Sequence, residues 1–296
     1  MGSPRRKHTK GLRVAMLVLL VSALTLSPWR AAAQAKTIVS VDGVGRVGPA
    51  GIMLSVGVAR RWLPEDSASP LARGRYLQLG LSANANPAYA QGSASIEWVP
   101  LAPFQLRLEY DAFGFFGTNG SLLRFPSASS KFGKAEIDAL SGKEESGLGH
   151  RVMFNPVLRA QLGWLVLRNE SEASWYRMSA RTGWYYEWEH DTLVGETDWL
   201  LANRTTAFLE LWRGRGEARL LAGPMYDLTR AGSADITRHR VGVSAYFEPA
   251  GRWLGFDRVR LYALAGVNVV DRNRPGDPFA LFGLGGDIDF DRAARP

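Results

Sequence analysis

Hydrophobic alternation with a period of two is the feature that most constrains this chain. In one clear stretch the even positions Phe104, Leu106 and Leu108 are apolar. The odd positions between them, Gln105 and Arg107, are polar. Successive side chains of a β-strand point to opposite faces, whereas a helix repeats every 3.6 residues. The pattern therefore predicts two-faced strands, most of them longer than the usual five or six residues.

Twelve stretches of this kind follow one another along the chain. They cover residues 37–47, 51–63, 74–85, 88–99, 103–117, 150–168, 174–189, 197–212, 216–228, 236–249, 257–270 and 277–290. The first alternates poorly, but single-chain bacterial barrels have an even number of strands, which supports keeping it. We expect an all-β antiparallel barrel of about twelve strands, with ten or fourteen as alternatives.

The connections between the stretches differ in length. Residues 99–103, 168–174 and 212–217 form short turns, while residues 118–148 form by far the longest loop. Short turns at one end and long loops at the other are typical of a membrane barrel with periplasmic turns and extracellular loops. We expect loop 118–148 either to fold into the pore as a constriction or to cover its mouth.

Alternation alone does not say which face is outside. A soluble barrel would turn its apolar face inward, and a membrane barrel would turn it toward lipid. Aromatic residues lie toward the ends of the apolar faces, as membrane-interface girdles do. They are Trp62, Trp98, Trp164, Tyr176, Trp184, Trp188 and Trp199. The other face mixes arginine with acidic residues, which suits a polar lumen. We therefore predict a transmembrane barrel.

The N-terminal residues have the form of an export signal. Five basic residues precede the apolar run 14–26, and Ala33-Gln34-Ala35 offers a cleavage motif of small residues. This predicts a signal peptide over 1–35 and a barrel domain over 36–296, with cleavage after Ala33 as the alternative. Without the six basic residues of 1–35, the chain has 30 basic and 28 acidic residues, so its net charge falls from +8 to +2. Nothing in this balance favours nucleic acid as a partner.

The chain contains no cysteine, which excludes disulfides and thiol chemistry. The final stretch, "FALFGLGGDIDF", places Phe282, Leu284, Ile288 and Phe290 on alternate positions before the short extension "DRAARP". With these features the chain resembles the outer-membrane β-barrel proteins of Gram-negative bacteria. The resemblance implies an outer-membrane location, contact with membrane lipid and lipopolysaccharide, and recognition of the last strand by the barrel-assembly machinery.

Inward-facing arginines are the main candidates for function. A hairpin centred near Glu170 would place Arg159 beside Arg181, and the next hairpin would bring Arg204 to the same row. The full set expected to face the lumen is Arg107, Arg159, Arg177, Arg181, Arg204, Arg219, Arg240 and Arg260. Such a lumen indicates either a salt-bridged filling or a pore that favours small polar or anionic solutes.

A second candidate lies in the stretch "RTGWYYEWEHD" and the residues that follow it. Its tryptophans are expected to face lipid. Its carboxylates would converge on the extracellular rim, where they would form either a solvated loop or, as a hypothesis, a cation site, since oxygen ligands suit calcium or magnesium. The residues are Glu187, Glu189, Glu196 and Asp198. No other cofactor is expected.

Catalysis on the outer wall is not expected. Barrel phospholipases use a serine, histidine and asparagine in hydrogen-bond contact, and contact between nucleophile and base is required. Here His239 and Asn203 share the apolar face but lie two strands apart, with no serine on the strand between them. We therefore predict a non-enzymatic outer-membrane barrel, a passive channel for small polar or anionic solutes. The alternatives are a structural or surface-interaction barrel with a plugged lumen and, less favoured, a lipid-modifying enzyme.

Overall fold

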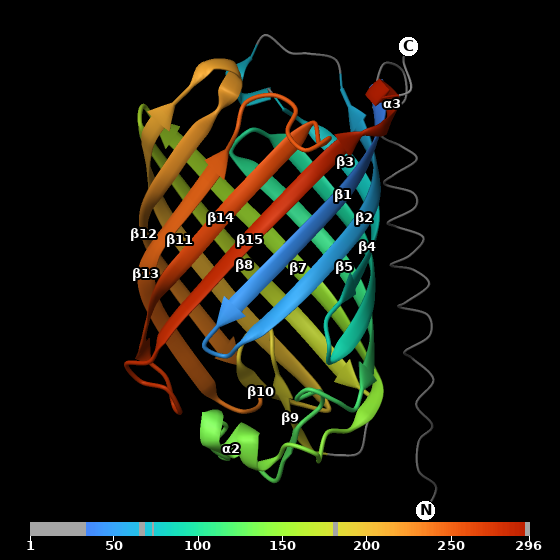
Figure 1. Ribbon diagram of the computed structural model, residues 1–296, viewed down its shortest axis with the longest axis vertical. Coiled ribbons are helices and arrows are strands. Elements are labelled where there is room, and N and C mark those ends of the chain that lie inside the picture. Colours follow the sequence, from blue (N-terminus) through green and yellow to red (C-terminus); the bar gives the residue numbers. More distant parts are fainter. Residues whose placement is uncertain (1–33, 65–68, 73, 180–182, 294–296) are drawn as a thin grey trace, which may run out of the picture.

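The computed structural model describes residues 34–64, 69–72, 74–179 and 183–293. Twelve antiparallel strands form a closed barrel in which each strand pairs with the next along the chain, and β15 closes against β1 (Figure 1). The wall strands are β1 (Gln34–Val47), β2 (Gly51–Leu63), β3 (Tyr76–Ala85), β4 (Tyr89–Leu101), β5 (Phe104–Phe116), β7 (Ser146–Leu162), β8 (Leu165–Met178), β11 (Thr197–Arg213), β12 (Arg219–Ala231), β13 (Ile236–Glu248), β14 (Arg258–Val270) and β15 (Pro278–Asp289). The expected all-β barrel of twelve strands is confirmed.

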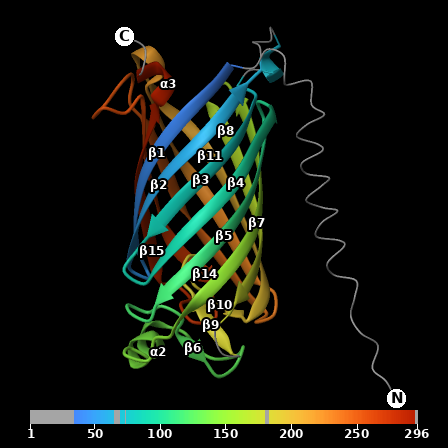
Figure 2. The ribbon, with the colours of Figure 1, turned by 90° about the vertical axis from the view of Figure 1, so that its right-hand side faces the viewer.

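Smaller elements lie at the two ends of the barrel (Figure 2). The end that carries the chain termini has η2 (Pro70–Ala72), η3 (Arg215–Glu217) and α3 (Phe290–Ala293). The opposite end has β6 (Arg124–Phe125), α2 (Lys134–Ala139), β9 (Trp184–Glu187) and β10 (Thr192–Gly195). No helix in the described residues is long and apolar enough to cross a membrane. In outer-membrane barrels the long loops face the cell exterior, so we refer to the end with β9 and β10 as the outer end.

The poorly alternating first stretch is a full wall strand. β1 pairs with β15 from Ile38↔Asp289 to Val47↔Ala280, and this pairing closes the barrel. The expected leader, 1–35, lies outside the described residues except for its last two, which begin β1. Both expected mature starts, Gln34 and Lys36, therefore fall at the beginning of this strand.

The outer surface of the barrel is apolar. Among its exposed side chains are Leu81, Leu162 and Phe282, which are 63%, 66% and 62% exposed. Water would strongly disfavour so many aliphatic side chains on one continuous wall, whereas lipid tails would not. The expected aromatic positions Trp98, Trp164 and Trp199 are also exposed on this wall, near the strand ends.

The turn between β7 and β8 differs from the prediction. The chain turns at Gly163 and Trp164, where Gly163 has a φ of +60° that glycine adopts without strain. The expected turn at 168–174 is instead the middle of β8, so the expected stretches 150–168 and 174–189 were wrong at this point. The charged residues at 168–174 suggested a loop because the sequence does not show that they have partners on neighbouring strands.

Four polar side chains explain how a wall strand can carry that sequence. Asn169 and Ser171 on β8 face lipid opposite Thr205 and Asn203 on β11. Asn169 Nδ2 donates to Thr205 Oγ1 at 2.8 Å, and Asn203 Nδ2 donates to Ser171 Oγ at 2.8 Å. The two amides also bond reciprocally at 3.2 Å. This polar box satisfies its own donors, which lowers the cost of placing it among apolar neighbours.

The aromatic stretch near residue 185 does not face lipid, contrary to expectation. Tyr176, Tyr185 and Tyr186 are 1%, 0% and 7% exposed, and Trp184 and Trp188 pack against a buried cluster. β9 and β10 form a hairpin with β6 as a third strand at the outer end of the barrel (Figure 1). We call Trp184–Gly195, with its turn, the plug hairpin.

The long loop of residues 117–145 covers the plug hairpin. Its side chains Leu122, Leu123, Phe125 and Phe132 are at most 3% exposed and belong to the clusters that include Tyr185, Tyr186 and Leu193. The loop therefore shares apolar clusters with the plug hairpin. Of the two expected arrangements, the structure has the loop over the mouth.

Candidate functional site

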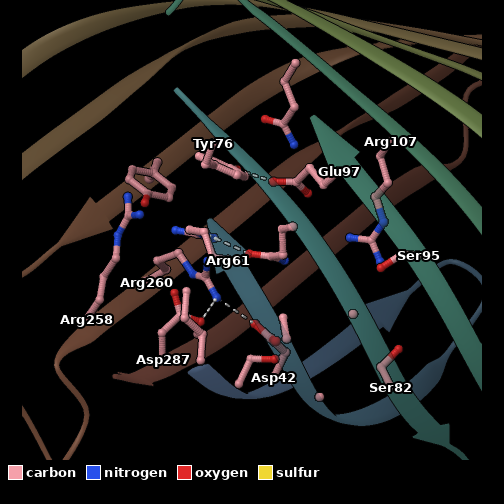
Figure 3. A pocket seen from close by; sticks show the side chains of 18 of the residues that line it. Asp42, Arg61, Tyr76, Ser82, Ser95, Glu97, Arg107, Arg258, Arg260 and Asp287 are labelled. Atoms are coloured by element: carbon pink, nitrogen blue, oxygen red, sulfur yellow. Dashed lines mark hydrogen bonds and ion pairs between the residues drawn. The ribbon is translucent and has the colours of Figure 1, made fainter. Parts of the chain in front are cut away.

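The barrel encloses a polar cavity of about 580 Å³ in the half that carries the termini. Its lining comes from all twelve wall strands, and Figure 3 shows side chains pointing into it from several of them. Arginines outnumber carboxylates in this lining: Arg61, Arg107, Arg159, Arg168, Arg219, Arg258 and Arg260 against Asp42, Glu97 and Asp287. We call this space the basic chamber.

Three strands build one ion-pair cluster in the chamber. Arg260 Nη2 on β14 lies 2.9 Å from Asp287 on β15 and 3.4 Å from Asp42 on β1. Gly285 sits between Asp42 and Arg260 in the register of these strands, and a Cβ there would overlap the Asp42 carboxylate. The missing side chain therefore makes room for a contact across two strand spacings, which Figure 3 shows at close range.

Two arginines of the chamber have amide partners in place of carboxylates. Arg61 Nε donates to Gln78 Oε1 at 2.8 Å, and its guanidinium lies 4.1 Å from the centre of the Tyr76 ring. Arg159 donates to Gln105 Oε1. Among the described residues neither guanidinium lies within ion-pair distance of a carboxylate. Their charge is therefore available to a solute in the chamber.

Closer to the outer end the arginines are neutralised in pairs. Asp227 on β12 lies 2.7 Å from Arg204 on β11 and 3.0 Å from Arg240 on β13. Asp227 is 4% exposed, so this carboxylate bridges two strands in a packed part of the lumen. These two arginines fill and brace the wall.

The eight predicted lumen arginines are thus divided. Arg107, Arg159, Arg219 and Arg260 line the basic chamber, and Arg204 and Arg240 face inward in pairs with Asp227. Arg177 is exposed and lies outward, because its neighbours Tyr176 and Met178 are buried inside. Arg181 lies outside the described residues.

The predicted arginine row across Arg159, Arg181 and Arg204 is wrong. Arg159 is opposite Arg168, and Arg204 is opposite Glu170. The displaced β7–β8 turn is the cause, because it shifts β8 against both neighbours and brings a glutamate where a third arginine was expected.

The plug hairpin is fastened to the barrel from several sides. Arg46 on β1 donates to the carbonyl oxygens of Trp188 and Glu189 at 2.5 and 2.9 Å. Arg151 on β7, 3% exposed, lies 2.6 Å from Glu189 and 2.6 Å from Asp111. The turn of the hairpin is therefore held between opposite walls.

Asp191 is the most enclosed of these contacts. Its carboxylate lies 3.2 Å from Arg274 and 3.4 Å from Arg238, and Oδ1 accepts the Tyr186 hydroxyl at 2.6 Å. Asp191 and Arg238 are 4% and 3% exposed. A buried carboxylate with two guanidinium partners fixes the hairpin to β13 and to the loop after β14.

His190 adds a cation at the same turn. It lies 3.2 Å from Glu187 and 3.4 Å from Glu172. Burial by itself would lower the pKa of His190, but the charges of Glu172 and Glu187 outweigh it and raise the pKa to about 10. His190 is therefore protonated at neutral pH and is an ion-pair partner rather than a neutral imidazole.

The four carboxylates of the predicted cation site are not gathered in one place. Glu187 and Glu189 lie together with His190, within 4.8 Å. Glu196 is exposed on the rim, and Asp198 is buried, accepting backbone N–H groups of Gly195, Trp199 and Ser233. The expected convergence of Glu187 and Asp198 is wrong, since Thr192 and not Asp198 lies opposite Glu187. The cation site remains a prediction for Glu187 and Glu189.

Comparisons with known proteins give structural neighbours but no family for the chain. No protein-family model and no curated protein sequence matches the chain. Its structure is similar to the β domain of the Bordetella autotransporter BrkA, with 13% identity, 86% of this chain and 99% of that chain covered, and a TM-score of 0.42. The translocator domain of the autotransporter NalP from Neisseria meningitidis has 11% identity over 95% and 97%, with a TM-score of 0.39. An outer membrane channel from Pseudomonas putida F1 has 11% identity over 87% and 96%, with a TM-score of 0.39.

The decisive observation is in the barrel itself. A closed antiparallel barrel with an even number of strands turns a continuous apolar wall outward and charged side chains inward. The chain is a bacterial outer-membrane β-barrel. Its wall contacts membrane lipid, and its location in the outer membrane is as expected.

The plug hairpin at the outer end is the part of this barrel that the sequence did not reveal. Its alternation continues from β8 without a break in composition, so residues 174–189 were expected to form one wall strand. One signal was present: the run Glu187–Asp191 contains four ionisable residues in five positions, more than a lipid-facing rim requires.

Proposed function

We propose that this outer-membrane barrel is a channel for small anionic solutes whose outer mouth is closed by the plug hairpin. The two arginines of the basic chamber that have no carboxylate partner among the described residues carry the proposal. The other five lining arginines are ion-paired, with Glu109, Glu170, Glu248, Asp42 or Asp287. Arg61 and Arg159 have only amide and aromatic partners among the described residues. A low-dielectric wall focuses such a field and attracts anions.

The plug hairpin closes the mouth of the barrel and would prevent continuous conduction through the chamber. Its contacts are ionic and hydrogen-bonded, and they end in one hairpin turn that includes Glu189, His190 and Asp191. A segment held by a few strong contacts is a two-state element that can be displaced as a unit. Passage through the barrel then requires the hairpin to leave the mouth.

Single-channel recording in planar bilayers tests the proposal. The informative variant replaces residues 184–195 with a short glycine-serine linker, which removes the plug and leaves every wall strand intact. We expect rare openings from the natural chain and steady conductance from the plug-less variant. Conductance that stays at the background level without the plug would refute the channel.

A structural or surface-interaction barrel with a plugged lumen is the second candidate. Its supporting observation is the burial of the Asp191 cluster, where Arg238 and Arg274 are 3% and 7% exposed. A plug that never leaves gives no conductance in the natural chain, but the plug-less variant still conducts. The two candidates therefore predict different conductance for the natural chain and the same conductance for the plug-less variant.

We also propose that the barrel has no catalytic role. His150 bonds to Tyr110 at 2.7 Å, and His239 bonds to Tyr226 at 2.5 Å, both on the lipid-facing wall. Leu228 lies between Asn203 and His239 in the register of the three strands, where a serine would be needed. Absence of lipase, esterase and protease activity from the purified barrel is the expected result, and turnover lost in a His239→Ala variant would refute it.

The remaining partners follow from the same architecture. We propose that lipopolysaccharide surrounds the outer end and that the barrel-assembly machinery recognises β15 together with Phe290, the first residue of α3. Phe282 and Leu284 are exposed on the lipid-facing side of β15, and Phe290 is exposed directly after it. A Phe290→Ala variant should insert more slowly, measured by the fraction of heat-modifiable barrel in the membrane. Equal insertion of the natural chain and the Phe290→Ala variant would contradict recognition of this strand end.

A further inference from the structure

A second cavity, different in character from the basic chamber, lies at the outer mouth. It has a volume of about 390 Å³ and lies between the outer ends of the wall strands, residues 119–122 of the long loop and the plug hairpin. Most of its lining side chains are apolar or aromatic: Ile52, Tyr89, Phe113, Phe115, Leu122, Tyr176, Met178, Tyr186 and Trp188. We call it the mouth pocket.

Aromatic rings form one wall of the mouth pocket. Tyr89 lies 5.7 Å from Phe113 and 5.6 Å from Phe115, measured between ring centres, and the two phenylalanines are 5.8 Å apart. Tyr89 and Phe113 are 6% and 7% exposed. Because all three rings come from neighbouring strands, they are held in place before any ligand arrives.

The opposite wall is Trp188 of the plug hairpin, which is also fixed. The Arg46 guanidinium lies 4.2 Å from the centre of its ring. The indole covers Gly51 so closely that a Cβ at Gly51 would overlap it. A ligand between Tyr89 and Trp188 would therefore enter a formed site and contact the plug directly.

Most polar groups around the mouth pocket are already used by the protein. The Asn86 side chain accepts the backbone N–H groups of Ala88 and Tyr89, and Ser121 Oγ accepts that of Thr118. Glu187 is paired with His190. A charged ligand would find no free counter-charge in this lining, whereas an apolar one would lose little on leaving water.

One hydroxyl of the lining is available to a ligand. Tyr89 Oη lies 4.0 Å from Met53 Sδ, and a thioether is a weak acceptor. A ligand with one hydrogen-bonding group could bond to it. The exposed part of the lining, Ala50, Pro87 and Asn119, belongs to the tips of outer turns, so the occupant arrives from the aqueous side.

We propose that the mouth pocket binds one small, neutral, largely apolar molecule with a single hydrogen-bonding group, such as a phenol or an aromatic ketone. The volume lies within the range of small-molecule sites, which is about 300–1,000 Å³. The pocket does not depend on channel activity, because its walls and its ligand class differ from those of the basic chamber.

Isothermal titration calorimetry on the natural barrel in lipid nanodiscs tests the proposal, with empty nanodiscs as the background. The probe is 2-naphthol, which is neutral at pH 7 and carries one hydroxyl. We expect saturable binding of one molecule per barrel. We expect no binding at this site for 2-naphthalenesulfonate, the same ring with a fixed negative charge. Absence of saturable 2-naphthol binding, or equal binding of the sulfonate, would overturn the proposal.

Two matched variants assign the binding to the pocket. Ala88→Trp, in the turn before β4, fills the cavity and should weaken 2-naphthol binding at least tenfold, while Ala90→Trp, exposed on the lipid side of β4, should leave it within twofold. Equal loss in both variants, with heat-modifiable migration retained, would overturn the site.

A third variant, Tyr89→Phe, separates the loss of binding from a loss of folding. Tyr89→Phe keeps the ring and removes the hydroxyl, so affinity for 2-naphthol should fall about two- to tenfold, the effect of one hydrogen bond. Unchanged affinity would mean that Tyr89 does not contact the ligand and would overturn the assigned class.

Discussion

Replacing Asp191 by asparagine should release the plug hairpin while the barrel stays closed. Asp191 joins the hairpin to Arg238 at 3.4 Å and to Arg274 at 3.2 Å, and it accepts the Tyr186 hydroxyl. Asparagine keeps the size of the side chain but removes the charge. Two guanidinium groups, 3% and 7% exposed, then remain buried without their carboxylate.

The size of the effect follows from this burial. Removing one partner of a buried ion pair costs about 3–5 kcal/mol, because the other charge stays desolvated. Each 1.4 kcal/mol changes an equilibrium constant about tenfold. The equilibrium constant for plug opening should therefore rise by roughly two to three and a half orders of magnitude.

Hydrogen exchange read by mass spectrometry measures this opening directly. Peptides that cover β9 and β10 should exchange faster in Asp191→Asn, while peptides from the wall strands should not change. Asp235→Asn is the matched control, since its pair with Arg230 is 3.8 Å long and both side chains are mostly exposed. Plug exchange equal to that of the natural chain, or equal acceleration in the wall strands, would refute the reasoning.

Three further predictions concern the ionised and polar groups. The pKa of His190 is raised to about 10 from an ordinary value of 6.5, so its contribution to plug stability is fully present below pH 6.5 and is lost as pH rises through about 10. The equilibrium constant for plug opening, obtained from exchange after correction for the base-catalysed intrinsic rate, should thus rise between pH 8 and about 10.5, and a constant independent of pH there would contradict this. In the lipid-facing polar box, Asn203→Ala removes the reciprocal amide pair with Asn169 and the bond to Ser171 Oγ, and should lower the free energy of unfolding by about 1–3 kcal/mol. Replacing both asparagines by leucine should cost less than twice the single change, and additive losses in urea unfolding would contradict a shared network. The predicted cation site requires calcium to raise the melting temperature of the natural chain but not of Glu187→Gln, and an unchanged wild-type melting temperature removes it.

The sequence predicted the architecture because alternation and parity are local properties that every wall strand carries. Phe104 to Leu108 show it by themselves, and the even strand number then supported even the poorly patterned β1. The inward direction of Arg107, Arg159, Arg219 and Arg260 followed from the same period.

The parts that failed depend on contacts between distant residues. Asn169 and Ser171 suggested a turn because their partners Asn203 and Thr205 lie more than thirty residues away. The shift of this one turn reversed the faces of β8 and placed Arg177 on the wrong side. An error of one residue in register exchanges every side chain between lipid and lumen.

The plug hairpin was missed for a related reason. Its residues Trp184 and Tyr186 alternate with other residues as in a wall strand. Packing under the long loop favours the same large apolar side chains as contact with lipid does. The ion pairs that distinguish the two, such as Arg46 with the Trp188 carbonyl, join segments about 140 residues apart. Alternation gives no information about such pairs.

The reversal potential of the plug-less barrel tests the central claim most directly. In a planar bilayer with a tenfold gradient of potassium chloride, an arginine-rich chamber predicts a reversal potential of the sign set by chloride. Replacing Arg61 and Arg159 by glutamine should move it toward zero, because these two guanidinium groups have no carboxylate partner among the described residues. A reversal potential of the sign set by potassium, or no conductance at all once the plug is removed, would contradict the account.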